Sequence, residues 1–338
     1  MDMRRFLLRK SVYVVITLFA IIAFNFFLFR VMPGDPVRVF IQKGMSPELE
    51  AIIRAKFHLD DPLLDQFISY LGQVFTLDFG YTTTFKPGST CAEIILPRLM
   101  NTLILVGLGT MLSIWIGVKI GKAAAWRRGK LVDTIGMGIS LVFYSMPTFL
   151  FALVLLLIFA GYLKWFPLAG AYGDIPQWSE SFLGQAPDTY LQMSLAQKIM
   201  SRAYHLVLPI IAFTLEIMAE FALIMRNSMT DVLTEDYITT ARAKGVSNKV
   251  ILNDHAMKNA MLPVVTVMAI SVGWVLGGTI MVELVFTYDG LGKLTYDAVF
   301  YKDYALLQAL FLIMAVAVLA ANLIADIVYT YLDPRVKI

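Results

Sequence analysis

Two acidic residues interrupt an apolar stretch of the chain and are its strongest chemical signal. Glu216 and Glu220 stand four residues apart within the run 206–225, so they share one face if this run is a helix. At the centre of a bilayer an ionised carboxylate that faces lipid costs about 3 kcal/mol. The pair should therefore face protein or a water-filled path. Pore lining and hydrogen bonding between helices are both open readings.

The motifs that carry nucleotide, metal or hydrolase chemistry are not found in this sequence. Gly121-Lys122 and Gly292-Lys293 each lack the earlier glycine of a phosphate-binding loop. HExxH and GxSxG do not occur, and the three histidines are widely separated, at His58, His205 and His255. We therefore expect no catalytic residue, no metal site and no cofactor in this chain, and no enzymatic activity of its own.

The composition places these residues in a membrane protein. Hydrophobic residues make up 58% of the chain and charged residues only 16%, with a mean hydropathy of +0.70; soluble domains carry roughly 25% charged residues. The net charge of +3 is small and spread over many loops, which argues against a nucleic-acid partner. The expected surroundings are a lipid bilayer.

Six apolar runs are long enough to cross a bilayer. They cover residues 11–29, 103–118, 134–163, 206–225, 263–282 and 305–332. The first run is too long for a signal peptide, and no small-residue cleavage site follows it. The third and sixth exceed the required length, so they must tilt, kink or leave the lipid. The expected fold is an all-α integral membrane protein with six transmembrane helices.

Basic residues near the span ends set the orientation. With the N-terminus inside, the inner segments hold 16 Lys and Arg residues, whereas the two shorter outer loops hold five. The positive-inside rule therefore predicts cytoplasmic N and C termini. The organisation follows as residues 1–30 with the first helix, an extracytoplasmic helical loop 31–98, and a core 99–338 that contains a cytoplasmic loop 226–262.

The outer segments carry helix signals and aromatic residues. Asp61-Pro62 opens a helix with Leu63, Leu64, Phe67, Ile68 and Leu71 on one face, which either forms a vestibule or caps the bundle. Aromatic residues flank the outer end of the third run, and they include Trp165 and Trp178. An interfacial aromatic belt explains them, and a lining for a solute is the alternative.

The sequence of the cytoplasmic loop predicts two short helices. Thr234 is an N-cap candidate, two acids follow it, and Gly245 is a C-terminal stop after Arg242 and Lys244. A second helix begins at Ser247, and Pro263 marks the start of the next span. A helix this short needs packing to persist. It is either an ordinary linker or a plug for a cytoplasmic subunit.

One pair of glycines favours close contact between helices. Gly273 and Gly277 form a small-xxx-small pair that permits close helix approach, either at a contact between two membrane subunits or by packing within one bundle. Met225 and Arg226 lie at the cytoplasmic mouth. With Glu216 and Glu220, these residues are the candidates for the translocation path or gate.

The cytoplasmic loop resembles the signature loop of ABC importer membrane subunits. The similarity rests on Thr240-Ala241-Arg242, then Gly245, and later Leu262-Pro263, with the spacing of the dipeptide, oligopeptide and nickel branch. Further motifs occur in the same order along the chain: Pro33-Gly34-Asp35-Pro36, Asn101-Thr102-Leu103, Glu283, Gly290-Leu291-Gly292, Lys302-Asp303-Tyr304 and Asp333-Pro334-Arg335. Leu223 stands where many members carry an arginine.

The resemblance implies a type I importer-like permease in a prokaryotic cytoplasmic (inner) membrane, forming half of a path for a small solute. Its partners would be a second homologous permease subunit, forming a heterodimer, two ATP-binding subunits that hold ATP and Mg, and an extracytoplasmic solute-binding protein. The solute would be a di- or oligopeptide, or a short oligosaccharide. The residues implied to couple to the ATPase are Glu235, Asp236, Thr240, Ala241, Arg242, Ala243, Lys244 and Gly245. The alternative is a stand-alone secondary transporter or channel.

Overall fold

The computed structural model describes residues 3–31, 61–187, 189–278 and 280–332. In these residues the fold is all-helical, as predicted, and the β-structure found there is an isolated bridge between Tyr81 and Thr90. The longer helices are α1 (Met3–Val31), α4 (Leu63–Phe75), α5 (Cys91–Trp126), α6 (Leu131–Ser145), α7 (Thr148–Leu155), α9 (Leu195–Val232), α12 (Met257–Gly278), α14 (Leu291–Phe300) and α15 (Tyr304–Leu332). The shorter ones include the π-helix η1 (Leu156–Tyr162), α8 (Glu180–Leu183), α10 (Asp236–Ala243), α11 (Asn248–Val250), the π-helix η4 (Ile251–Ala256) and α13 (Ile280–Val285).

Four helices among the described residues are long and apolar enough to cross a bilayer: Lys10–Arg30, Cys91–Trp126, Leu195–Val232 and Tyr304–Ile324. A fifth span arises if α6 is counted together with the helix formed by α7 and η1. The two parts are bent by 101° relative to each other. The sequence predicts one run over 134–163. The break falls at Met146, whose backbone is extended, because a proline disfavours the helical conformation in the residue before it.

The outer boundaries of two spans differ from the predicted runs. α5 begins at Cys91, inside the segment expected to be an outer loop, because Thr90 and Glu93 form a reciprocal capping box there. α9 begins at Leu195 behind a second capping box made by Ser194 and Gln197. At 1.5 Å per residue, these helices of 36 and 38 residues are each roughly 55 Å long. They extend beyond a hydrocarbon core of about 30 Å.

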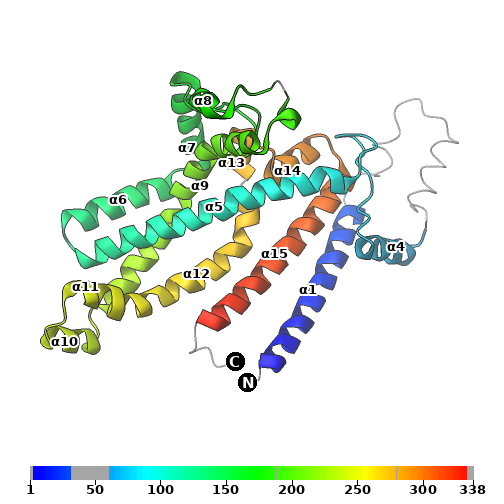
Figure 1. Ribbon diagram of the computed structural model, residues 1–338. Helices are drawn as coiled ribbons and strands as arrows, with labels where there is room; N and C mark the ends of the chain where they lie inside the picture. The colour runs from blue at the N-terminus through cyan, green and yellow to red at the C-terminus, as the bar shows by residue number, and fades with distance from the viewer. Residues whose placement is uncertain (1–2, 32–60, 188, 279, 333–338) are drawn as a thin grey trace.

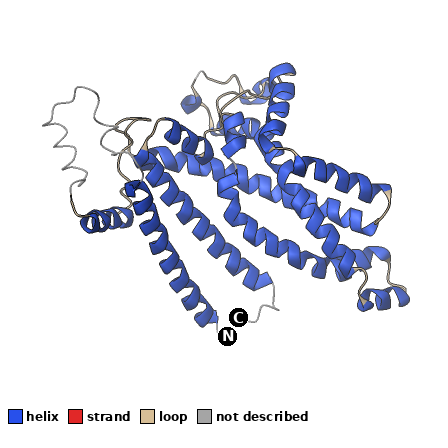
Figure 2. Cartoon of the chain, turned by 180° about the vertical axis from the view of Figure 1, so that it is seen from behind, coloured by secondary structure: helices blue, strands red, loops and turns tan. Residues whose placement is uncertain are grey.

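The centre of the molecule is the packing of α5 against α9 (Figures 1 and 2). Glycines at four-residue spacing on α5 bring the two backbones together. A Cβ atom placed on Gly117 would lie 2.5 Å from the carbonyl oxygen of Met218, and one on Gly121 would lie 2.4 Å from that of Ala222. Four residues before Gly117, the Ser113 hydroxyl donates to the carbonyl oxygens of Gly109 and Thr214. The helices can approach this closely only because α5 presents small residues.

The two ends of the bundle differ in content. Figure 1 shows the start of α1, the end of α15 and α10 toward one end, with α4, α8 and α14 toward the other. The connection after α10 does not form a separate second helix. α11, η4 and α12 follow one another without a gap from Asn248 to Gly278, and Pro263 lies inside α12. The sequence predicts that a span starts at Pro263, and this prediction is wrong: the helix has already begun, and Pro263 removes one backbone hydrogen bond within it.

Candidate functional site

Both ends of α10 follow from its residues. Glu235 occupies the N-cap and Asp236 the first helical position, so two acids lie at the positive end of the helix dipole. Thr234 is not the cap. Its hydroxyl donates instead to the carbonyl oxygen of Asp231 at 2.6 Å, which satisfies the end of α9.

The other end of α10 confirms the predicted glycine stop. Gly245 has a φ of +76°, in the left-handed region that glycine adopts at little cost. Its N–H donates to Arg242 O at 3.0 Å, and the N–H of Val246 donates to Ala241 O at 3.2 Å. These two bonds make a Schellman motif, which satisfies the last carbonyl groups of the helix.

α10 is held by two apolar side chains and a tyrosine. Ile238 and Ala241 are buried in a cluster that contains Met225 of α9, Ile251 of η4 and Ala125 of α5. The Tyr237 hydroxyl accepts a hydrogen bond from Asn259 Nδ2 at 2.8 Å. Such a short helix is stable only when packed, and these contacts provide that packing.

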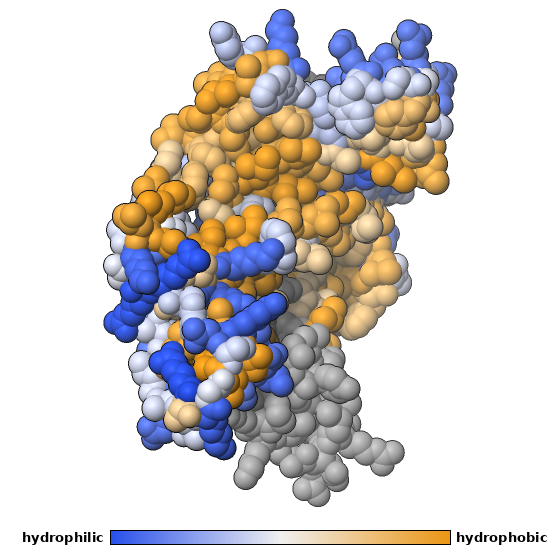
Figure 3. Space-filling model, turned by 60° about the vertical axis from the view of Figure 1, so that its left-hand side comes forward, coloured by the Kyte–Doolittle hydropathy of each residue, from blue (hydrophilic) through white to orange (hydrophobic). Residues whose placement is uncertain are grey.

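The remaining side chains of this segment are exposed. They are Glu235, Asp236, Thr239, Thr240, Arg242, Ala243 and Lys244. The acids lie at one end and the cations at the other, with small and hydroxylated residues between them. Figure 3 shows hydrophilic side chains gathered low on the face where α10 and α11 lie, below a broad apolar band. The exposed residues of α10 therefore form a polar face on the chain.

The structure places the predicted path residues in different environments. Glu216 is half-buried and Glu220 is exposed on α9, and neither makes a hydrogen bond or ion pair with a residue that the structure describes. Met225 is fully buried in the cluster around Ile238. The surroundings of Gly273 and Gly277 lie outside the described side chains.

Arg226 forms a bidentate ion pair with Asp133. Its Nε lies 2.6 Å from Asp133 Oδ1 and its Nη2 lies 2.8 Å from Oδ2. Oδ2 also accepts from the N–H of Gly129 at 2.9 Å. The pair fastens the first turn of α6 and the turn before it to α9, at the residue that directly follows Met225. Arg226 was expected at a gate from its position alone, and the structure gives it a named interhelical partner.

At the opposite end, a buried carboxylate organises residues that the resemblance names separately. Glu283 accepts from the Thr102 hydroxyl at 2.7 Å and from the N–H of Lys293 at 3.0 Å. A Cβ atom on Gly290 would lie 2.3 Å from this carboxyl group, which explains the glycine. Glu283 thus caps α14 and joins it to α5. The sequence gives no signal for the contact between Thr102 and Glu283, because these residues lie 181 positions apart.

Asp303 plays a similar part at the start of α15. Its Oδ2 accepts from the N–H groups of Thr83, Thr84 and Phe85 at 2.8–3.1 Å, and its Oδ1 accepts from the N–H of Leu306. The carboxylate therefore caps α15 and fixes the loop before α5 on top of it.

An open cavity of about 1360 Å³ lies beside the first half of α9. Trp165, Trp178 and Tyr204 line it together with the acids Asp174 and Glu180. Both tryptophans are largely exposed. This placement fits either of the two readings of the aromatic residues, a belt at the membrane surface or a lining for a solute.

Comparison with known proteins assigns both parts of the chain. Residues 109–338 match the family described as binding-protein-dependent transport system inner membrane component, and residues 3–97 match the N-terminal part of such membrane components. The chain is 32% identical over 335 residues to the oligopeptide transport system permease protein AppB of Bacillus subtilis, covering 99% of this chain and 100% of AppB. It is 33% identical over 339 residues to the dipeptide transport system permease protein DppB of Escherichia coli K12, covering 99% of each.

Two further comparisons are with a permease named for glutathione transport and with a solved structure. The glutathione transport system permease protein GsiC of Salmonella choleraesuis is 32% identical over 335 residues, covering 99% of each chain. Among solved structures, an inward-facing MetNI methionine ABC transporter aligns with a TM-score of 0.53 at 14% identity, covering 71% of this chain and 97% of the other. This likeness supports the fold.

Proposed function

Because this chain belongs to the family of binding-protein-dependent transport system inner membrane components, it is a membrane permease subunit of an ABC importer, and we propose that α10 receives the movement of separate ATPase subunits. The observation that carries this proposal is the geometry of α10. Its exposed side chains form a polar face, while Ile238 and Ala241 anchor it to α9, η4 and α5. A force on the exposed side is therefore passed directly to the core.

The proposed topology follows from the same placement. If α10 meets ATPase subunits, it lies in the cytoplasm, and so do the start of α1 and the end of α15, which lie toward the same end of the molecule. Six spans result when the α6–α7 pair and α12 with α13 are each counted as one crossing. The surrounding membrane is then the cytoplasmic (inner) membrane of a prokaryote.

The proposed path runs along the side of α9 that carries Glu216 and Glu220. A carboxylate exposed on a transmembrane helix is costly against lipid, so we place water, solute or a second permease subunit there. That subunit would be a related but different chain, and an extracytoplasmic binding protein would deliver the solute. The relatives named for oligopeptide, dipeptide and glutathione transport favour a peptide, with a short oligosaccharide as the alternative.

Replacing Gly245 with valine tests the coupling proposal. A β-branched residue disfavours a φ of +76° by about 2 kcal/mol, so the end of α10 must rearrange. In the complete complex in proteoliposomes, we expect ATP hydrolysis to continue while uptake of a radiolabelled dipeptide falls about tenfold, the equivalent of 1.4 kcal/mol.

Gly184 offers a matched control for this substitution. It has a φ of +79° and open space around its Cβ position, as Gly245 has, but it follows α8 at the other end of the molecule. Gly184→Val should leave uptake within about twofold of the wild type. Unchanged uptake by Gly245→Val, with the wild-type complex active in the same assay, would contradict a coupling role for α10.

A further inference from the structure

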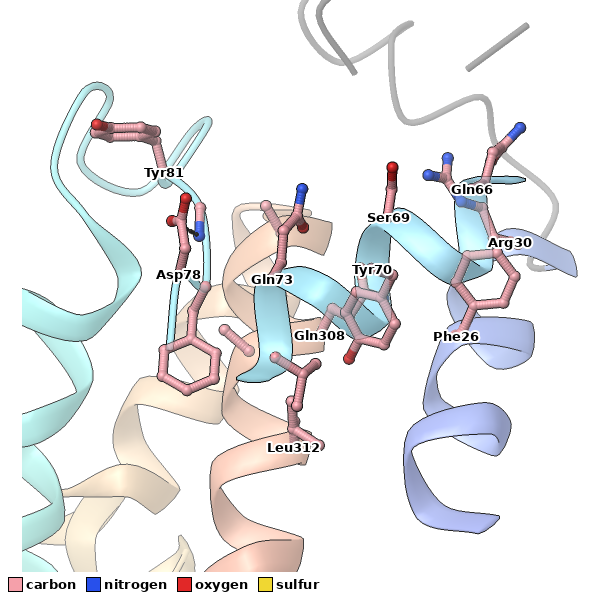
Figure 4. Close-up of a pocket in the computed structure, with 15 residues that line it drawn as sticks. Phe26, Arg30, Gln66, Ser69, Tyr70, Gln73, Asp78, Tyr81, Gln308 and Leu312 are labelled. Atoms are coloured by element: carbon pink, nitrogen blue, oxygen red, sulfur yellow. Dashed lines mark hydrogen bonds between the residues drawn. The ribbon is translucent and has the colours of Figure 1, made fainter. Parts of the chain in front are cut away.

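A cavity of about 170 Å³ opens between α1, α4 and the start of α15, at the end of the molecule opposite α10 (Figure 4). Its size is far above the roughly 10–15 Å³ that one water needs. Its lining combines polar and apolar side chains. The polar lining residues are Arg30, Gln66, Ser69, Tyr70, Gln73, Asp78, Tyr81 and Gln308.

Arg30 is the unusual member of this lining. It is half-buried in the last turn of α1, and its guanidinium carbon lies 5.6 Å from the centre of the Phe26 ring. It makes no hydrogen bond or ion pair with any residue that the structure describes. A partly desolvated cation without a counter-ion is costly, and a planar guanidinium beside a cavity is well suited to bind an oxyanion.

The other polar groups do not neutralise this charge. Asp78 lies at the opposite end of the cavity from Arg30 in Figure 4, and its Oδ1 accepts from the N–H of Gly80 at 3.1 Å. The Tyr70 hydroxyl accepts from Asn25 Nδ2 at 2.9 Å. Counting the described residues alone, the cavity thus has a cation without an ion-pair partner at one end and a carboxylate at the other.

The cavity also lies where lipid head groups are expected. The apolar span of α1 ends at Arg30, and cationic residues at span ends lie at head-group level. α4 packs its inner side on α1 through Phe67 and Tyr70, whose rings lie 5.3 and 5.8 Å from that of Phe26.

Apolar side chains are exposed next to the cavity. On α4, Leu64, Ile68 and Phe75 are 68%, 57% and 73% exposed. On α1, Phe24 and Phe27 are 69% and 53% exposed. An exposed apolar face on a short helix beside a membrane span is typical of an element that lies in the bilayer interface. Acyl chains can cover these residues while a head group occupies the cavity.

We propose that the cavity between α1, α4 and α15 binds the head group of a phospholipid, with the phosphate against Arg30 and the acyl chains along the exposed apolar sides of α1 and α4. Asp78 disfavours further negative charge at the other end and suits a head group that carries an amine. The site is independent of the coupling function of α10.

The test is lipid binding by the complete, delipidated complex, measured by native mass spectrometry with dioleoyl phosphatidylethanolamine as the probe. Arg30→Gln should weaken binding roughly tenfold, because it removes a charge-assisted contact, whereas Arg30→Lys should retain most of it. Ser69→Phe fills the cavity without touching the cation, and it should also lower occupancy.

Arg98 is the matched control for Arg30. It is half-buried, lies 5.9 Å from the Phe85 ring and does not line the cavity, so Arg98→Gln should bind lipid as the wild type does. Three results would overturn the proposal: equal binding by Arg30→Gln, equal binding of dioleoylglycerol, which has no phosphate, or displacement of the lipid by millimolar inorganic phosphate.

Discussion

At the scale of single residues, the contact between Arg226 and Asp133 shows what position alone could not reveal. The sequence marks Arg226 as a cation at the cytoplasmic mouth, but its partner lies 93 residues away, and no pattern links the two. Asp133 has only 6% of its side chain exposed. A charge in this position requires its partner, because removing one member of a buried pair leaves the other unpaired.

We expect Asp133→Asn or Arg226→Gln alone to destabilise the permease by about 3 kcal/mol, the usual cost of leaving one charge of a buried pair uncompensated. The double substitution should recover part of this loss, since neither charge remains. Thermal unfolding of the purified chain measures the effect. Lys293→Gln, which removes two more exposed i,i+4 pairs, with Asp289 and Asp297, should cost less than about 1 kcal/mol. Additive losses in the double variant would show that the two residues act separately.

At the scale of elements, small residues decide how α5 and α9 meet. The sequence predicts close helix approach at Gly273 and Gly277 of α12. The close approach seen between α5 and α9 uses small residues of α5, namely Gly109, Ser113, Gly117 and Gly121. Their spacing is visible in the sequence. What the sequence cannot show is which of several small-residue faces meets a partner, because that depends on tertiary packing.

Alanine at two glycines of α5 should change stability in opposite directions. Gly117→Ala places a Cβ atom 2.5 Å from a backbone oxygen of α9, and we expect a loss of about 1–3 kcal/mol. Gly107 has open space, so Gly107→Ala should gain up to about 1 kcal/mol from helix propensity. The melting temperatures of the two variants, measured in the same detergent, test this difference in stability. Equal effects would mean that α5 and α9 do not pack as described.

The short helix α10 was the most predictable element. Its acids, cations and glycine act within one or two turns, so local rules suffice, and only the cap shifted from Thr234 to Glu235. Prolines were less predictable. Pro147 follows a break whereas Pro209 and Pro263 lie inside helices. Neighbouring helices decide whether a proline only kinks a helix or ends it.

At the scale of the whole molecule, the apolar runs and the all-helical fold follow from the sequence because bilayer thickness sets a minimum length. Bilayer thickness does not set a maximum helix length, so the sequence did not predict how far α5 and α9 extend beyond the apolar runs. Buried carboxylates that connect distant segments, such as Glu283 and Asp303, also escape it. Each depends on contacts that exist only after the helices assemble.

The proposed orientation can be tested by labelling introduced cysteines with a membrane-impermeant maleimide in spheroplasts. Thr240→Cys on α10 should react only after permeabilisation, whereas Ser181→Cys on α8 should react in intact spheroplasts. Both positions are exposed, and the native Cys91 is fully buried. Labelling of Thr240→Cys in intact spheroplasts would reverse the topology and exclude contact with cytoplasmic ATPases.

The sharp turn between α6 and α7 constrains what can surround it. The last four carbonyl groups of a helix lack partners within that helix, and hydrocarbon offers no donors to them. If the 101° bend lies at membrane depth, acyl chains are excluded as its neighbours. Water or a second protein surface must then contact Ser145 and Met146. This corner is therefore a part of the molecule's perimeter that lipid does not cover.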